Sequence, residues 1–402
     1  MKIAVLGAGQ QGTACVYDLL QNRSVSEIGV ADTDKERADL LVAGIRRFRP
    51  DNSMTTLSAF EVDVTDPDQL TDFLALYDVV ISAVPYFLNL RVTEAAIAAK
   101  THMVDMGGNT DLVFEQRKLD AQAKQAGVTI LPDCGLAPGM ANIIAAHGIA
   151  QMDQVESLKI RVGGLPQAPQ PPLNYQLFFS VHGLINEYIG QSIVIRDGKI
   201  TSVETLTEIE TVHLAQPIGH PPQQDLEAFH TLGGLSTLPW TFADKVRNMD
   251  YKTLRYPGHC QQIKTMADLG LMAEEPRLID GQTIRPRDVF AAVVSERLNT
   301  ERNGWNPRDV VVVLITIEGS RAGQPVHLHY ELIDHYDEAT GLTAMMRTTA
   351  FPVSIVAQML GDGTIGERGV LPLETTVPTQ PFIDALLQRN LRLQTAAGSR
   401  TR

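Results

Sequence analysis

A glycine-rich hexapeptide near the N-terminus constrains the fold of this chain more than any other feature. Its residues are Gly7, Ala8, Gly9, Gln10, Gln11 and Gly12. The hexapeptide matches G-x-G-x-x-G, follows the apolar residues 3–6 and precedes the helix-like residues 13–20. The glycines permit a tight turn, close approach of a pyrophosphate, and close packing of helix on strand. The helix N-terminus adds free N–H groups for the phosphates, so all six residues are expected to line a dinucleotide site.

An acidic residue follows at the spacing that such a site requires. Twenty residues after Gly12, the apolar pair Val30-Ala31 ends at Asp32. A carboxylate there accepts hydrogen bonds from the adenosine ribose and repels a 2′-phosphate, which favours NAD over NADP. Alternatively, the glycines form only a turn and Asp32 caps the next segment. Strand, spacing, helix and acid together favour the cofactor site.

Short apolar runs alternate with helix-like segments over the first third of the chain. The runs are residues 3–6, 28–31, 62–64, 79–84, 103–104 and 128–131. Helix starts are indicated by Asp34 and by the pair Asp66-Pro67, because an acidic cap and a proline at the first position suit a helix N-terminus. The alternation predicts an α/β fold: a Rossmann-type doubly wound parallel sheet over residues 1–150.

The pattern changes after residue 150. Four prolines lie between residues 166 and 172, and the apolar residues 310–317 and the alternating residues 326–332 predict a β-hairpin. We therefore expect an α+β domain with a mostly antiparallel sheet over residues 151–348. Residues 349–402, with helix-like stretches at 353–360 and 382–391, are expected to pack back on the first domain.

Composition excludes several functional classes. Lys and Arg number 34 against 47 Asp and Glu, a net charge of −13, so a nucleic-acid or anionic-membrane footprint is not expected. The three cysteines, Cys15, Cys134 and Cys260, are far apart, which argues against a disulfide framework or a zinc cluster and favours the reducing cytoplasm. No H-E-x-x-H or similar spacing occurs, so no metal is predicted.

Polar residues follow the later strands of the predicted sheet, where ligands of such sheets bind. They are Ser82, Ala83, Val84, Tyr86, Asn109 and Asp133. The first three are expected to lie under the dinucleotide. Asp63, after the third apolar run, either flanks the adenine or caps a loop.

Three further segments stand out: Pro85-Tyr86, the segment from Gly135-Leu136 to Pro138-Gly139, and the segment from Thr253-Leu254-Arg255-Tyr256 to Gly258. Together they resemble the saccharopine dehydrogenase family of carbon–nitrogen oxidoreductases. Further segments resemble the lysine 6-dehydrogenase branch of that family. These lie at residues 171–175, 179–184, 228–234 and 347–350.

The resemblance covers nearly the whole chain and implies more than the residues alone. It implies NAD as acceptor, L-lysine as substrate, and a homodimer formed through an inserted substrate and dimerisation domain. It also implies that Arg255 holds the substrate α-carboxylate, a role that suits a guanidinium, although an internal salt bridge is the alternative. Tyr86 is implied to lie in the reactive pocket, and Tyr175, His230 and Asn109 are further expected substrate contacts.

The implied reaction moves a hydride from the lysine Cε to the nicotinamide, and water then releases the semialdehyde and ammonia. The lysine ammonium, with a pKa of about 10.4, must first lose a proton. Asp133, Tyr86 and His182 are the expected candidates for the base, and an alkaline optimum follows. For His182 and His230 a structural role is equally open. Other family reactions, on saccharopine or carboxynorspermidine, and a non-catalytic NAD sensor remain as alternatives.

Overall fold

The structure, a computed structural model, describes residues 1–48, 54–298 and 307–398. The described chain divides into two compact units. Unit 1 comprises Met1–His147, Ser236–Leu238 and Met346–Arg392, and unit 2 comprises Gly148–Leu235, Pro239–Met345 and the residues from Leu393.

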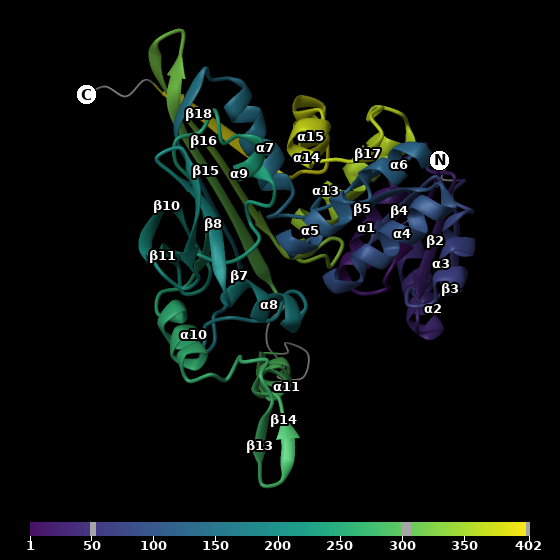
Figure 1. Cartoon of the computed structure of the whole chain (residues 1–402), viewed down its shortest axis with the longest axis horizontal. Helices are drawn as coiled ribbons and strands as arrows, with labels where there is room; N and C mark the ends of the chain where they lie inside the picture. Colours follow the sequence, from purple (N-terminus) through teal and green to yellow (C-terminus); the bar gives the residue numbers. More distant parts are fainter. Residues whose placement is uncertain (49–53, 299–306, 399–402) are drawn as a thin grey trace. The chain divides into compact units, whose positions relative to one another are not determined.

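The sheet of unit 1 is parallel, with the strand order β17-β6-β5-β4-β1-β2-β3 (Figure 1). Its strands are β1 (Lys2–Leu6), β2 (Glu27–Asp32), β3 (Thr56–Glu61), β4 (Val79–Ser82), β5 (His102–Asp105), β6 (Thr129–Leu131) and β17 (Gly369–Val370). The strand order reverses at β1, between β2 and β4. Ligands of such sheets bind beyond the carboxyl ends of the strands at this point. The predicted Rossmann-type fold class is confirmed.

Helices connect these strands. They are α1 (Gln10–Leu20), α2 (Lys35–Ile45), η1 (Arg46–Phe48), α3 (Pro67–Leu74), η2 (Tyr86–Leu88), α4 (Asn89–Ala99), α5 (Thr110–Arg117), α6 (Asp120–Ala126), α14 (Leu373–Thr376) and α15 (Thr379–Gln388), while α7 (Met140–Ala150) and α13 (Ala344–Gly361) cross a unit boundary. The predicted helix starts are confirmed. Asp34 and Asp66 each cap a helix by accepting two backbone N–H bonds.

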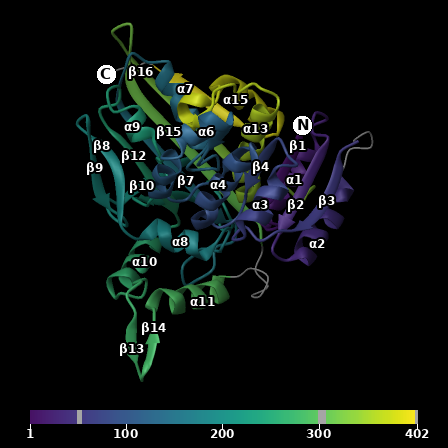
Figure 2. The same ribbon diagram turned by 45° about the vertical axis from the view of Figure 1, so that its right-hand side comes forward.

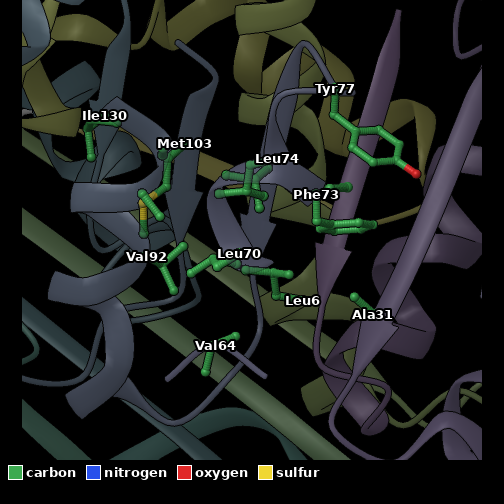
Figure 3. Packing of buried hydrophobic residues seen from close by; sticks show 14 of the residues in the cluster. Leu6, Ala31, Val64, Leu70, Phe73, Leu74, Tyr77, Val92, Met103 and Ile130 are labelled. Atoms are coloured by element: carbon green, nitrogen blue, oxygen red, sulfur yellow. The ribbon is translucent and has the colours of Figure 1, made fainter. Parts of the chain in front are cut away.

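The core of unit 1 packs helices against the strands that lead to the site. Leu70, Phe73 and Leu74 form the buried face of α3, at the spacing of one helical stripe. Figure 3 shows them with Val92 of α4 and Met103 of β5. These five side chains are buried together with Val80 of β4, so the packing holds β4 and β5 and therefore the strand ends beyond them.

Unit 2 contains a mixed nine-stranded sheet. Its strands are β7 (Gln154–Pro166), β8 (Gln191–Arg196), β9 (Lys199–Glu204), β10 (Glu210–Ile218), β11 (Gln223–Phe229), β12 (Met249–Arg255), β15 (Asp309–Arg321), β16 (Gln324–His335) and β18 (Leu393–Gly398). Their order is β10-β11-β12-β7-β15-β16-β18, with β8 between β12 and β9. The pairs are antiparallel except β12 with β7. The predicted hairpin is confirmed as β15–β16.

Smaller elements complete unit 2. They are α8 (Val181–Tyr188), α9 (Leu238–Thr241, which begins in unit 1), α10 (His259–Asp268), β13 (Arg277–Ile279), β14 (Gln282–Ile284) and α11 (Pro286–Leu298). The β13–β14 hairpin extends away from the large sheet of this unit (Figure 2).

Three strands differ from the sequence prediction. The third strand is Thr56–Glu61, so the prediction of a strand at residues 62–64 is wrong. This strand is the edge of the sheet and is half exposed, so it lacks the apolar run of an interior parallel strand. The C-terminal segment supplies β17, which makes seven strands instead of six. Residues from Leu393 form β18 in unit 2, whereas the sequence predicts that all of residues 349–402 pack on the first domain.

Candidate functional site

The glycine loop has a backbone that larger residues cannot adopt. Gly7 has φ of +100°, and a Cβ there would lie 2.7 Å from the carbonyl oxygen of Ala83. A Cβ on Gly12 would overlap the carbonyl oxygen of Gly7. Gly9 is the N-cap of α1 and provides no side-chain cap to it. The loop therefore leaves the helix N-terminus open to an anion and fits a dinucleotide pyrophosphate.

Asp32 ends β2 and is bound to this loop. Its Oδ2 accepts the N–H of Ala8 at 2.8 Å, and its Oδ1 accepts the N–H of Asp34 at 3.0 Å. The carboxylate therefore ties the glycine loop to the start of α2 and also lies where an adenosine ribose is expected. A cation lies close as well: Nη2 of Arg37 is 3.9 Å from the position that a Cβ on Gly9 would occupy.

The end of β4 approaches the same loop. Ala83 donates its N–H to the carbonyl of Leu6 at 2.8 Å, and the buried Ser82 donates its hydroxyl to Oδ1 of Asn89 at 2.8 Å. Val84 and Tyr86 follow and are half-buried. Tyr86 begins η2, and its Cβ is 3.5 Å from where a Cβ on Gly108 would be, so the turns after β4 and β5 are neighbours.

Two predicted ligand residues make local capping contacts. Oδ1 of Asn109 accepts the N–H of Leu112 at 3.1 Å at the start of α5. Oδ1 of Asp63 accepts the N–H and the hydroxyl of Thr65 at 2.8 and 2.7 Å, and these bonds lower the pKa of Asp63. Roles of Asn109 and Asp63 toward ligands stay predictions.

Two buried carboxyl groups lie side by side after β5 and β6. Asp105 and Asp133 are each 1% exposed. Oδ1 of Asp105 accepts the N–H of Gly107 at 2.8 Å and that of Asp133 at 2.9 Å, and its Oδ2 accepts the amide of Gln116 at 2.9 Å. Oδ2 of Asp133 accepts the hydroxyl of Ser236, while Oδ1 is buried without a hydrogen-bond partner among the described residues.

This environment makes Asp133 hard to ionise. Burial first, and then the charges of Asp105 and Glu374, raise the pKa of Asp133 to about 8, against hydrogen bonds from Ser236 and Gly108. Burial also raises the pKa of Asp105. Because Asp105 has three hydrogen-bond donors, we assign the negative charge of the pair to Asp105 and the proton to Asp133.

A second polar cluster lies in unit 2 around Arg255, which is 3% exposed at the end of β12. Its Nε donates to the hydroxyl of Tyr188 at 3.2 Å, and its Nη2 is 3.5 Å from Oε2 of Glu187. The guanidinium carbon is 4.6 Å from the ring centroid of Tyr175. The internal salt bridge weighed as an alternative for Arg255 is thus present.

His259 completes this cluster as a neutral base. Burial lowers the pKa of His259 to about 3. Its Nδ1 is 2.9 Å from the carbonyl oxygen of Leu173, which can only accept, so we assign the proton to Nδ1. Its Nε2, 2.9 Å from the hydroxyl of Tyr188, therefore accepts from that hydroxyl. This hydrogen bond orients the Tyr188 hydroxyl, so that its oxygen accepts the Nε–H of Arg255.

The remaining predicted residues of unit 2 differ in their surroundings. His230 is fully buried, with Nδ1 3.2 Å from the carbonyl of Tyr251 and Nε2 3.1 Å from Oε2 of Glu208. Both nitrogens therefore contact the fold. His182 lies exposed on α8. Tyr175 is buried, its pKa is raised by burial, and its hydroxyl has no hydrogen-bond partner in the part of the chain that the structure describes.

Within the described residues, no group of three or more His, Cys, Asp or Glu side chains is arranged to hold a metal ion. In the same ranges, no helix combines the length and the apolar character needed to cross a membrane.

Protein-family models match almost the whole chain. The model described as Saccharopine dehydrogenase NADP binding domain matches residues 3–131, and the Saccharopine dehydrogenase C-terminal domain matches residues 135–391. The chain belongs to the saccharopine dehydrogenase family. It is accordingly an oxidoreductase of that family with a pyridine-nucleotide-binding first domain. Asp133 lies in the short stretch between the two matched regions.

Individual family members cover the chain end to end. The saccharopine dehydrogenase [NADP(+), L-glutamate-forming] of Pyricularia oryzae is 27% identical over 96% of each chain. The carboxynorspermidine synthase of Vibrio cholerae is 23% identical over 96% of this chain and 94% of its own. The apo saccharopine dehydrogenase (L-Glu forming) of Saccharomyces cerevisiae superposes with a TM-score of 0.76 over 99% of both chains at 22% identity, which supports the fold.

Sequence reasoning missed part of the cluster around Asp133. Ser236 and Thr237 come from a distant segment, and Thr237 donates to both carboxylate oxygens of Glu374, at 2.8 and 3.0 Å. Glu374 is 4% exposed. Neither the Ser-Thr pair nor the lone acid carries a motif. Ser236 and Thr237 lie just after residues 228–234, a segment that resembles the family, whereas Glu374 is more than 20 residues from any such segment.

Proposed function

We propose that this family member catalyses NAD-dependent oxidative deamination of the ε-amino group of L-lysine, giving the 6-semialdehyde and ammonia. The observation that carries the proposal is the buried Asp133, whose pKa of about 8 makes it available as a base at alkaline pH. It lies beyond the carboxyl ends of β5 and β6, on the sheet that also carries the glycine loop. The segments that resemble the lysine 6-dehydrogenase branch favour lysine.

Asp133 has the chemistry that an amine substrate needs. The ammonium form of lysine has no lone pair to drive hydride loss, so a proton must leave before oxidation. Once Asp133 has ionised, its Oδ1 accepts that proton, since its other oxygen is engaged with Ser236. When bound, NAD supplies the hydride acceptor. Tyr86, at the neighbouring turn, lines the same edge of the sheet.

Arg255 is proposed to bind the substrate α-carboxylate. A guanidinium held by Tyr188 and stacked on Tyr175 keeps a fixed plane, which suits bidentate pairing with a carboxylate. His230 has both ring nitrogens engaged, so we assign it to supporting the fold. His182 is exposed and does not share the contacts of Arg255.

The choice of NAD rests on Asp32, whose charge disfavours a 2′-phosphate. One observation favours NADP instead: Arg37 lies beside the glycine loop and could pair with that phosphate. The matching family model is described as NADP binding, and the Pyricularia relative is a saccharopine dehydrogenase [NADP(+), L-glutamate-forming]. A direct comparison of the two nucleotides decides between them.

The second candidate function is another family reaction, on saccharopine or carboxynorspermidine, the compounds that the names of the relatives contain. These substrates carry a secondary amine, which also needs a base, so Asp133 serves this reaction equally. The relatives favour this reaction, while Asp32 and the lysine-branch motifs favour lysine. A non-catalytic NAD sensor would not require a base of this kind.

A homodimer through unit 2 is also proposed. The β13–β14 hairpin exposes Leu278 and Ile279, and α11 exposes Val289 and Val293, by 50 to 76%. Two-stranded hairpins are marginal alone, and a second copy would cover the same apolar patch by two-fold symmetry. Leu278→Lys is expected to shift the mass in light scattering from dimer to monomer. A wild-type monomer at micromolar concentration would contradict the proposal.

The test is NADH formation from L-lysine and NAD at alkaline pH, with NADP, ornithine and saccharopine in parallel. We expect turnover with lysine and NAD, rising with pH through about 8 as Asp133 ionises. Turnover with saccharopine and not with lysine would show that saccharopine is the substrate. It would leave the assignment to the family unchanged. Tight NAD binding without any turnover would favour the sensor.

A further inference from the structure

A three-residue segment, Ser236–Leu238, belongs to unit 1 although the chain on either side of it belongs to unit 2. All three residues are buried, at 2, 1 and 0% exposure. Ser236 has φ of +47°, a backbone conformation that residues other than glycine rarely adopt. A buried segment with a strained backbone is stable only where contacts with its surroundings stabilise that conformation.

The two hydroxyl groups of the segment each hold a carboxyl group. Ser236 donates to Oδ2 of Asp133, and Thr237 donates to both oxygens of Glu374. These contacts join the turn after β6 to the start of α14 through residues more than 100 positions away from either acid. The segment therefore reaches two acids that belong to the same buried cluster.

We propose that Ser236 is a positioning residue, which fixes the Asp133 carboxyl so that Oδ1 is the oxygen that exchanges a proton with the amine substrate. This proposal rests on the proposed function for the identity of the amine. Ser236 lies outside both the glycine loop and the Arg255 cluster.

The orientation of the Asp133 carboxyl is determined from three sides. Its backbone, at φ of +62°, is held by the bond from its N–H to Asp105. Gly107 packs so closely that a Cβ there would overlap Oδ1 of Asp133. The Ser236 hydroxyl then engages Oδ2. Without the Ser236 hydroxyl, the carboxyl keeps the backbone hydrogen bond from Gly108 but loses the side-chain bond that holds Oδ2.

The hydroxyl also affects how readily Asp133 ionises. Asp105, Glu374 and the thiol of Cys134 all lie near this carboxyl, and their negative forms oppose its charge. The bond from Ser236 favours the charged form. Removing it is therefore expected to raise the pKa of Asp133.

The variant Ser236→Ala tests the proposal, with Thr237→Val as a matched control that removes the neighbouring hydroxyl. We expect Ser236→Ala to move the alkaline rise of kcat upward by about one pH unit, the effect of one hydrogen bond to a charged group. At pH 7.5, kcat should fall about tenfold, while KM for the amine and for NAD changes less than twofold. Thr237→Val should leave the pH of the rise in place.

A second readout does not depend on turnover. Urea unfolding of wild type from pH 5 to 10 should show stability falling until pH reaches about 8, because the folded state keeps a proton that the unfolded state releases. In Ser236→Ala the fall should continue about one unit further, and in Asp133→Asn this component should vanish.

The outcomes separate the two proposals. If the stability curves shift as expected but lysine gives no NADH, the Ser236 contact stands and the proposed substrate fails. If Ser236→Ala retains the wild-type pH rise and stability curve, or if Thr237→Val shifts them equally, Ser236 only anchors the segment and the positioning role is overturned.

Discussion

The Arg161 and Arg255 clusters of unit 2 and the Asp105–Asp133 pair of unit 1 bury ionisable side chains in opposite ways. In unit 2, the buried Arg161 is bound to Asp250 at 2.6 Å, and Arg255 faces Glu187. Each cation there has a carboxylate partner. In unit 1, Asp105 and Asp133 are nearly inaccessible, and the hydrogen bonds they accept come from backbone N–H, amide and hydroxyl groups.

The difference matters because a buried charge is costly unless it is paired. In the pairs of unit 2, the carboxylate neutralises the charge of the arginine. Such pairs are suited to keeping side chains in a fixed orientation. The acid pair of unit 1 avoids its cost by keeping a proton. Ionisation of Asp133 as the pH rises through about 8 then supplies the base that the proposed reaction needs.

The largest effect is expected for Asp133→Asn. An amide has nearly the shape of the carboxyl group but cannot accept the proton, so kcat for the amine should fall about 10²- to 10⁴-fold, as for loss of a general base. Stopped-flow or steady-state NADH formation measures this change. Binding of NAD, followed by fluorescence, should stay within twofold and serves as the control. Wild-type turnover in this variant would remove Asp133 as the base.

The close contact between Gly107 and Asp133 predicts the next effect, on stability. Gly107→Ala adds a Cβ at φ of +72° that overlaps Oδ1 of Asp133, whereas Gly127→Ala adds one at φ of +76° with open space around it. Both share a backbone cost of about 1 kcal/mol, and the overlap should add about 2 kcal/mol to the first. Urea unfolding measures the difference.

A double-mutant cycle sharpens this result. In an Asp133→Ala background the overlap with the carboxyl is gone and the 3.0 Å contact with the Cα of residue 133 remains, so the excess cost of Gly107→Ala over Gly127→Ala should fall to about 0.5 kcal/mol. An excess cost of Gly107→Ala that persists in this background would show that its origin is not the carboxyl group.

Arg255→Lys tests whether the Arg255 cluster of unit 2, in which Glu187 pairs with the guanidinium, binds substrate. Lysine keeps the charge but loses the planar fork and the bond from Nε to Tyr188. We expect KM for the amino acid to rise about 10- to 100-fold with a smaller change in kcat. Glu187→Gln is the matched variant, since it removes the partner charge and keeps the guanidinium. A loss of stability with unchanged KM would make Arg255 a purely structural ion pair.

The sequence predicted the first unit well because local patterns define it. The glycine loop, Asp32 and the caps at Asp34 and Asp66 are all set by short-range geometry. The sequence did not predict the edge strand β3 at its correct position, because its half-exposed residues lack an apolar run.

The cluster around Asp133 could be predicted only in part. Asp133 was found because it follows a strand, but its high pKa depends on Asp105, Glu374 and Ser236, which are brought together by the tertiary fold. Likewise, the sequence alone could not show that both nitrogens of His230 are engaged. Burial and long-range pairing decide these properties, and no local spacing reports them.

The smallest effect concerns Asp32, a third acid that differs from both groups above. Its carboxylate accepts two backbone N–H groups, of Ala8 and Asp34, and its negative charge repels a 2′-phosphate. Asp32→Ser should weaken NAD about tenfold and improve NADP by a similar factor, measured as KM with either nucleotide. Adding Arg37→Gln to this variant should reverse the gain for NADP, because the guanidinium near Gly9 is then lost. If Asp32→Ser leaves the nucleotide preference unchanged, the carboxylate serves only to join the glycine loop to α2.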